Sequence, residues 1–147
     1  VFAAPSADYI LAGLRELTGP AGTLLLISRH EGDVINGMEA AMLAADEGLN
    51  VRPLWMYDDI SSAPKGQEAD RRGAAGTLFV YKILGAAAEE GMDLDALAAL
   101  GEAVRGATRT LGCSPCPRTR CSSAWACMAS RGWAGAKWNR CAILWAS

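Results

Sequence analysis

The stretch from residue 23 to residue 57 constrains the fold of this chain more than any other. Thr23 to Ser28 is a short apolar run bounded by turn residues, which predicts a strand buried on both faces. A helical pattern follows from about Asp33 to Gly48, and Val51 to Tyr57 predicts a second strand. A strand, a helix and a strand over about 35 residues form a right-handed crossover, in which the two strands pair in parallel. The sequence therefore predicts an α/β fold with a parallel sheet.

Two details of this crossover can be tested by the structure. Apolar residues recur at helical spacing and predict the buried face of the helix: Ile35, Met38, Met42, Ala45 and Leu49. Pro53 removes a backbone donor from the second strand, so we expect it near the start of that strand or at an edge of the sheet.

Three further helices are predicted to flank the sheet. Ser6 is a plausible N-cap for a helix over residues 7–17, and apolar periodicity predicts helices over residues 75–90 and 93–109. The polar loop from Ile60 to Gly73 is long enough to have a function of its own.

Bulk properties exclude several classes of partner. The net charge of −2 argues against a nucleic-acid partner, and no apolar run reaches the roughly 18 residues of a membrane span. The first residues lack the basic and apolar regions of a signal peptide, so we expect a cytoplasmic protein. Because the chain does not begin with Met, we expect an excised piece of a longer protein.

Asp33 is the first candidate for a functional residue. In open α/β sheets, ligands bind at the carboxyl ends of strands, where helix N-termini direct free N–H groups outward. Asp33 lies at such a junction, although a plain helix N-cap is the alternative. The neighbouring His30 and Glu31 suggest a metal site, but a lone histidine in a loop is more often solvated, so we expect no metal.

Two charged pairs have weaker functional interpretations. Asp58-Asp59 follows the second strand, where it could contact phosphate or magnesium, although a polar strand exit is the simpler interpretation. Arg71-Arg72 could bind an anion or a partner subunit, or could be a solvated or capping pair.

The order and spacing of several short motifs resemble the substrate-binding K domain of dihydroxyacetone (glycerone) kinases over residues 2–112. The matching segments are Phe2–Ala7, Gly32–Asn36 after the first strand, Asp58-Asp59, Arg71–Thr77 and Lys82–Glu89. The resemblance implies a two-lobed α/β kinase domain that works as a homodimer. This chain would supply part of one lobe.

The resemblance also implies a reaction, which is phosphoryl transfer to a small ketose. The family binds dihydroxyacetone covalently on a histidine. No cofactor is implied for this domain, because ATP or ADP with magnesium is held by a separate nucleotide-binding subunit or domain, or a phosphotransferase chain serves as donor. Asp33 matches the aspartate that hydrogen-bonds the substrate hydroxyl and assists proton transfer, with Ser28 and Gly32 beside the substrate. We expect helix N–H groups to keep Asp33 ionised.

The chain departs from the family pattern near this site. The family usually has lysine at Ser28, then Asn and Tyr at Arg29 and His30, and its upstream Gly-Gly-Gly-Ser-Gly-His stretch is missing. Both family histidines are absent, so we predict that this chain alone is inactive. A kinase for a four-carbon ketose such as erythrulose is one alternative function, and a non-catalytic regulatory paralogue that binds a partner protein is another.

Residues 113–147 differ in kind from residues 1–112. All five cysteines and four of the five tryptophans lie there, and no acidic residue does. Codons for Trp125 to Arg131, read from the third base of the Trp125 codon, admit Gly-Met-His-Gly-Glu-Pro-Gly, which resembles the family motif with the covalent histidine. We therefore expect an irregular, frameshifted tail after a domain spanning residues 1–112. The zinc-knuckle-like spacing of Cys113, Cys116, Cys121 and Cys127 is then accidental.

Overall fold

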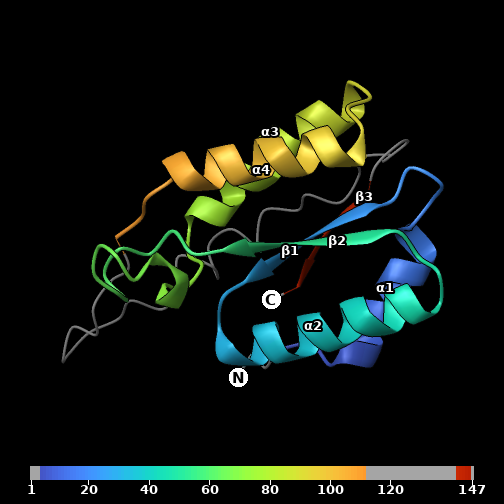
Figure 1. The fold of residues 1–147 in the computed structure, drawn as a ribbon, viewed down its shortest axis with the longest axis horizontal. Coiled ribbons are helices and arrows are strands. Elements are labelled where there is room, and N and C mark those ends of the chain that lie inside the picture. Colours follow the sequence, from blue (N-terminus) through green and yellow to red (C-terminus); the bar gives the residue numbers. More distant parts are fainter. Residues whose placement is uncertain (1–3, 112–141, 147) are drawn as a thin grey trace, which may run out of the picture.

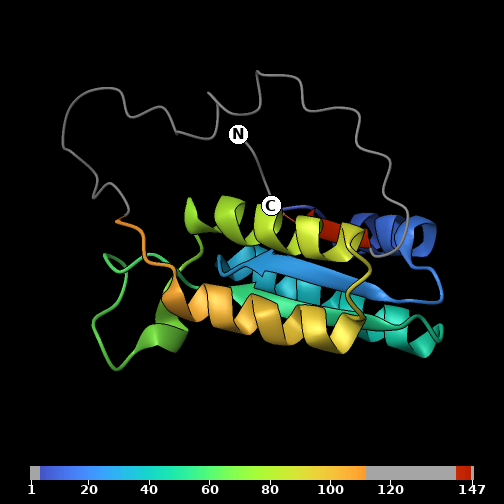
Figure 2. The same ribbon diagram turned by 90° about the horizontal axis from the view of Figure 1, so that it is seen from above.

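β1 (Thr23–Ser28) is the central strand of a three-stranded parallel sheet with the order β2-β1-β3. The computed structural model describes residues 4–111 and 142–146. Figure 1 shows α1 (Ala7–Leu17) and α2 (Glu31–Asp46) on one face of the sheet, with α3 (Gly76–Glu89) and α4 (Leu94–Ala107) on the other. The view from above in Figure 2 looks onto α3 and α4, with the sheet behind them. This arrangement confirms the predicted α/β class.

The crossover from β1 through α2 to β2 (Val51–Met56) forms as the sequence predicts. The two strands pair in parallel, from Thr23 opposite Val51 to Ser28 opposite Met56. All six residues of β1 are buried, because helices cover both of its faces. Pro53 lies on β2, at an edge of the sheet among the described strands, which confirms the expectation for its position.

The buried face predicted for α2 is wrong within the helix, where Ala45 is also exposed, although Leu49 beyond the helix end packs against the core as expected. Ile35, Met38 and Met42 are 59%, 50% and 66% exposed, whereas the residues that face the core are small: Gly37, Ala40 and Ala44, with Asp33 at the helix start. The reason is the short distance between α2 and β1. A Cβ atom on Gly37 would lie 2.7 Å from Cδ1 of Ile27, so no larger side chain fits there. Ile35, Met38 and Met42 consequently face outward, while Leu43 packs against the core from a partly buried position.

The other predicted helices form close to their expected bounds. Ser6 caps α1 by accepting a hydrogen bond from the backbone N–H of Tyr9 (3.4 Å), and Asp93 caps α4 in the same way through Ala96 (2.8 Å). The loop between β2 and α3 contains a short 3-10 helix, η1 (Glu68–Asp70).

Two apolar clusters hold the layers together. One joins α1 and α2 to one side of the sheet, through Leu14, Leu25 and Ile27 among others. The second joins α3 and α4 to the other side, through Leu26, Leu54 and Leu84 among others. Successive residues of β1 therefore serve opposite clusters, as strand geometry requires.

The region expected to be an irregular tail contains one strand. β3 (Ala142–Ala146) pairs in parallel with β1, starting at Ala142 opposite Thr23. A short apolar segment can pair with an open strand edge whatever its origin, because the pairing uses backbone groups. The cysteines at positions 113–127 lie outside the described residues.

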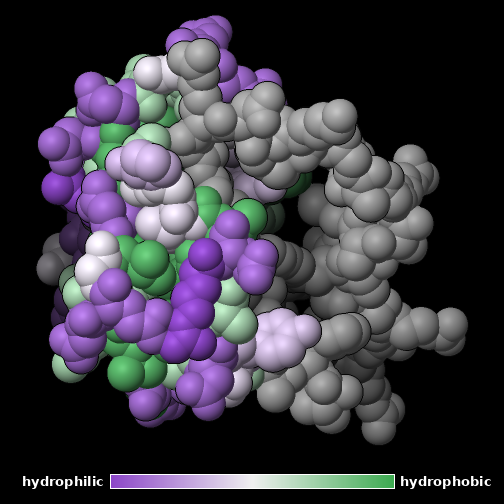
Figure 3. Space-filling view, turned by 90° about the vertical axis from the view of Figure 1, so that its right-hand side faces the viewer, coloured by the Kyte–Doolittle hydropathy of each residue, from purple (hydrophilic) through white to green (hydrophobic). Residues whose placement is uncertain are grey.

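The end view of the molecule in Figure 3 shows apolar side chains in separate patches between hydrophilic ones. No helix in residues 4–111 is both long enough and apolar enough to span a bilayer.

Candidate functional site

Asp33 is a buried carboxylate in the first turn of α2. The helix begins at Glu31, so Asp33 is an inner residue of that turn and not the N-cap, a position occupied by His30. Asp33 is only 5% exposed, and no hydrogen bond from the described residues contributes to its pKa. Burial raises the pKa of Asp33, and the nearby charge of His30 opposes that shift.

The expectation that helix N–H groups keep Asp33 ionised stays a prediction, and burial acts against it by raising the pKa of the carboxyl group. The dominant effect on its pKa is desolvation, which favours the neutral form. The carboxyl group is consequently a better proton acceptor than an ordinary aspartate, and its oxygens remain available for a ligand hydroxyl.

Ser28 and Gly32 lie on either side of the turn that leads to Asp33. Ser28 ends β1 and is buried, with its hydroxyl 3.5 Å from the carbonyl oxygen of Gly73. A Cβ atom on Gly73 would lie 2.9 Å from Ser28 Oγ and 3.0 Å from the carbonyl oxygen of Met56, so this glycine packs directly against the ends of both strands. Gly32 is exposed. The structure thus adds Gly73 to the strand-end region that contains the predicted site.

Asp58 is a second buried carboxylate at the same edge of the sheet, directly beyond β2. Its side chain is fully buried. Its carboxylate oxygens accept hydrogen bonds from the N–H groups of Ala74 (2.9 Å) and Gly76 (2.8 Å) and from the hydroxyl of Thr110 (2.6 Å). Asp58 therefore fixes the start of α3 and the segment after α4 to the end of β2.

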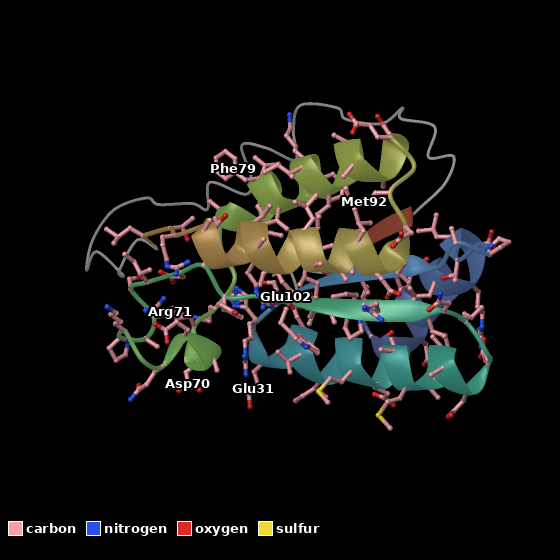
Figure 4. All side chains as sticks on the ribbon, turned by 45° about the horizontal axis from the view of Figure 1, so that its top comes forward. Glu31, Asp70, Arg71, Phe79, Met92 and Glu102 are labelled. Atoms are coloured by element: carbon pink, nitrogen blue, oxygen red, sulfur yellow. The ribbon has the colours of Figure 1, made fainter. Side chains whose placement is uncertain are left out.

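Asp59 and Arg71 also serve the loop between β2 and α3. Asp59 accepts hydrogen bonds from the N–H (3.0 Å) and hydroxyl (2.6 Å) of Ser61. Arg71 is buried, donates to the carbonyl oxygen of Ala63 (3.0 Å) and lies 3.6 Å from Glu68. Figure 4 shows Arg71 within this loop. The contacts favour the structural interpretations of these residues, while Arg72 stays exposed.

Arg105 is a buried residue that sequence reasoning missed. Its guanidinium donates to the carbonyl oxygen of Trp55 (3.0 Å), pairs with Glu102 and lies 4.3 Å from the ring centroid of Tyr57. Its Nε atom is buried and has no hydrogen-bond partner within the described part of the chain. Arg105 thereby satisfies the hydrogen-bonding capacity of a carbonyl group of β2. The sequence shows only a helical arginine three residues after a glutamate, a spacing that is equally typical of an ion pair on the solvent-exposed face of a helix.

No cluster of three or more potential metal ligands occurs among residues 4–111 and 142–146. His30 is exposed beside Glu31, which Figure 4 shows at the start of α2.

The family model for the Dak1 domain matches residues 1–124. A dihydroxyacetone-binding subunit DhaK of a PTS-dependent dihydroxyacetone kinase, from Listeria innocua, is 42% identical over 118 residues, which cover 79% of this chain and 36% of the relative. A D-erythrulose kinase from Mycolicibacterium smegmatis is 42% identical over 112 residues, or 76% of this chain and 19% of the relative. The chain thus spans about a third or less of these relatives.

Solved structures agree with these sequence matches. The dihydroxyacetone kinase of C. freundii, in its native form, superposes with a TM-score of 0.65 at 40% identity and covers 70% of this chain and 18% of its own. A second structure of that kinase, in complex with AMP-PNP and Mg²⁺, gives 0.64 at 39% identity, covering 70% and 19%. A dihydroxyacetone kinase operon co-activator, Dha-DhaQ, gives 0.64 at 34% identity, covering 70% and 32%.

Proposed function

Because the chain belongs to the Dak1 domain family, we propose that it is the substrate-binding part of a kinase for a small ketose such as dihydroxyacetone. The family match over residues 1–124 and the relatives named for dihydroxyacetone binding support this function. The observation that carries it is Asp33, a buried carboxylate in the first turn of α2, whose raised pKa and lack of a hydrogen bond among the described residues suit a hydroxyl ligand. The reaction of the complete protein would be phosphoryl transfer to that hydroxyl in the cytoplasm.

In this proposal Asp33 accepts the proton of the substrate hydroxyl, and Ser28 and Gly32 line the same site. The Ser28 hydroxyl is close to Gly73, so the loop before α3 closes one side of the site. The lysine that the family usually has at position 28 is replaced by serine, which removes a charged donor and predicts weak binding.

The nucleotide would be held elsewhere, on a partner subunit or domain that carries ATP or ADP with magnesium. The C. freundii kinase was solved with AMP-PNP and Mg²⁺, and this chain covers 19% of it. The Listeria relative is itself named a subunit. A nucleotide-binding subunit is therefore one proposed partner, and a second copy of the chain is the other because the family resemblance implies a homodimer.

Titration of the 147-residue chain with dihydroxyacetone, followed by ¹H–¹⁵N NMR, tests this function. We expect shifts confined to residues around Ser28 to Asn36 and Gly73, and we expect Asp33→Asn to weaken them strongly because a neutral amide replaces the carboxylate that receives the hydroxyl proton. Glu39→Gln, an exposed change on the same helix, is the matched control and should leave the shifts unchanged. Shifts elsewhere, or none at all, would contradict the proposal.

We also propose that the chain alone is inactive and that residues 113–147 are a frameshifted continuation of the domain. The codons from Trp125 onward support this, because they admit the family's histidine motif in another frame. Sequencing the gene tests the frameshift directly. Mass spectrometry with dihydroxyacetone should show no stable adduct, and a stable adduct would overturn the absence of the covalent histidine.

A non-catalytic regulatory function is the second candidate, since an operon co-activator has the same fold at 34% identity. The D-erythrulose kinase is as similar to this chain as the Listeria subunit is, at 42% identity, so a four-carbon ketose is an alternative substrate. Parallel titration with erythrulose distinguishes the two ketoses, and binding of neither favours the regulatory function.

A further inference from the structure

The outward face of α2 carries an apolar stripe that nothing in the described structure covers. Ile35, Met38 and Met42 are 59%, 50% and 66% exposed. They recur at three and four residues and therefore lie along one side of the helix. We call these three residues the α2 stripe. Exposed apolar side chains that gather on one surface often mark an interaction site.

The stripe is not a by-product of poor packing on the inner side. The inner face of α2 is filled by Gly37, Ala40 and Ala44 with Leu43 beside them, and the close approach to Ile27 leaves no room for a larger residue at position 37. The packing of α2 on the sheet therefore does not require the side chains of the α2 stripe. Methionine is flexible and polarizable, and it is common on surfaces that accept helical partners.

Charge selects the kind of partner. Glu31, Glu39 and Asp46 are exposed and alternate with the α2 stripe along the helix, and α2 contains no Lys or Arg. A second copy of α2 would bring like charges together, and an anionic membrane surface would be repelled. A helix with basic residues beside an apolar stripe would bury the methionines and pair with the carboxylates.

We propose that the α2 stripe, with its acidic margin, is a docking surface for a basic amphipathic helix of a partner protein. The surface lies on the outward side of α2, while the proposed substrate site occupies the buried start of that helix. Binding at the two places is consequently separable. The proposal does not depend on whether the chain binds a ketose.

Fluorescence anisotropy with a short synthetic helix that has a leucine stripe and lysine margins tests this surface. A matched peptide with glutamate in place of lysine is the control ligand. We expect the lysine peptide to bind the 147-residue chain and the glutamate peptide to bind at least about tenfold more weakly. Equal binding of both peptides, or binding of neither, overturns the proposal.

Substitutions in the protein test whether the lysine peptide binds at the α2 stripe. Met38→Glu/Met42→Glu should weaken binding of the lysine peptide by about tenfold or more, because both apolar contacts are lost. Phe79→Glu/Ile83→Glu is the matched control on α3, where Phe79 and Ile83 are 60% and 42% exposed. Figure 4 shows Phe79 directed outward on α3, away from α2. An equal loss in both variants would show nonspecific apolar binding and contradict the proposal.

A charge-reversal variant provides the decisive result. Glu39→Lys/Asp46→Lys keeps the α2 stripe and inverts its margin, so we expect the variant to prefer the glutamate peptide. Both positions are exposed, so the fold should tolerate the change, which circular dichroism melting verifies. An unchanged preference for the lysine peptide would mean that charge does not select the partner.

Discussion

Asp33 and Asp58 are two buried carboxylates at the same edge of one sheet, and their surroundings are opposite. Asp58 accepts hydrogen bonds from two backbone N–H groups and the Thr110 hydroxyl. Asp33 has no hydrogen bond among the described residues, and burial raises its pKa. The difference teaches that position at a strand end does not by itself indicate function. A carboxylate whose acceptor sites are filled by the protein holds the structure together, whereas an unfilled one is available to a ligand.

The largest expected effect comes from removing Asp58. Asp58→Ala leaves two backbone donors and the Thr110 hydroxyl buried without an acceptor, which should lower the free energy of unfolding by about 3 kcal/mol or more. Urea unfolding measures this loss. Thr110→Val removes only one of the bonds and should cost about 1 kcal/mol. Equal losses in the two variants would contradict the role assigned to Asp58.

The next largest loss of stability is expected at Gly76, which packs against the Asp58 carboxylate. A Cβ atom on Gly76 would lie 2.5 Å from Asp58 Oδ2, so Gly76→Ala should destabilise by about 2 kcal/mol. Gly106 is the matched control, because it is helical and nothing lies within 4 Å of its added Cβ. Gly106→Ala should stabilise by about 0.5–1 kcal/mol through helix propensity. Thermal melting of both variants checks the opposite signs.

Removing the charge of Asp33 should cost little stability. Asp33→Asn keeps the shape of the side chain and eliminates a desolvated carboxylate, so we expect the free energy of unfolding at neutral pH to stay within about 0.5 kcal/mol of the parent value or to rise. Guanidinium unfolding at pH 7 measures it. A loss comparable to that of Asp58→Ala would show that Asp33 has a structural role and would remove the contrast between the two residues.

The smallest effect is a dependence of stability on pH. Burial raises the pKa of Asp33 above its ordinary value of 3.8, so the folded chain binds this proton more tightly than the unfolded chain. The contribution of Asp33 to stability is therefore present below pH 3.8 and is lost as the pH rises through the folded pKa. Glu47 contributes in the opposite direction, since its hydrogen bond with Arg15 lowers its pKa.

Comparing the parent chain with Asp33→Asn isolates the pH effect of this one residue. The stability difference between the two chains should shift in favour of the Asn variant as the pH rises above 3.8, and should then level off. Denaturant unfolding over a series of pH values measures the difference. A constant difference across the series would mean that the pKa of Asp33 is the same in the folded and unfolded chains.

The family and part of the candidate site were accessible from the sequence. Gly32-Asp33 after an apolar strand marked the strand end, and the motif order marked the Dak1 resemblance that the family match over residues 1–124 confirms. The roles of Asp58 and Arg105 were not accessible. Asp58 acts through backbone N–H groups 16 and 18 residues further along the chain, and Arg105 reaches a carbonyl group 50 residues away. Such contacts leave no local pattern.

The sequence by itself determined the strand β1, the parallel crossover to β2 and the helix caps at Ser6 and Asp93, because these depend on local periodicity and local hydrogen bonds. Only the tertiary structure decided which face of α2 is buried. Apolar periodicity predicts that the face with the large apolar residues is buried. The short distance between Gly37 and Ile27 leaves no room for a large side chain at that position, so the face with the small residues is buried instead. The same holds for the two aspartates, since whether a buried carboxylate is satisfied depends on which distant donors the fold brings to it.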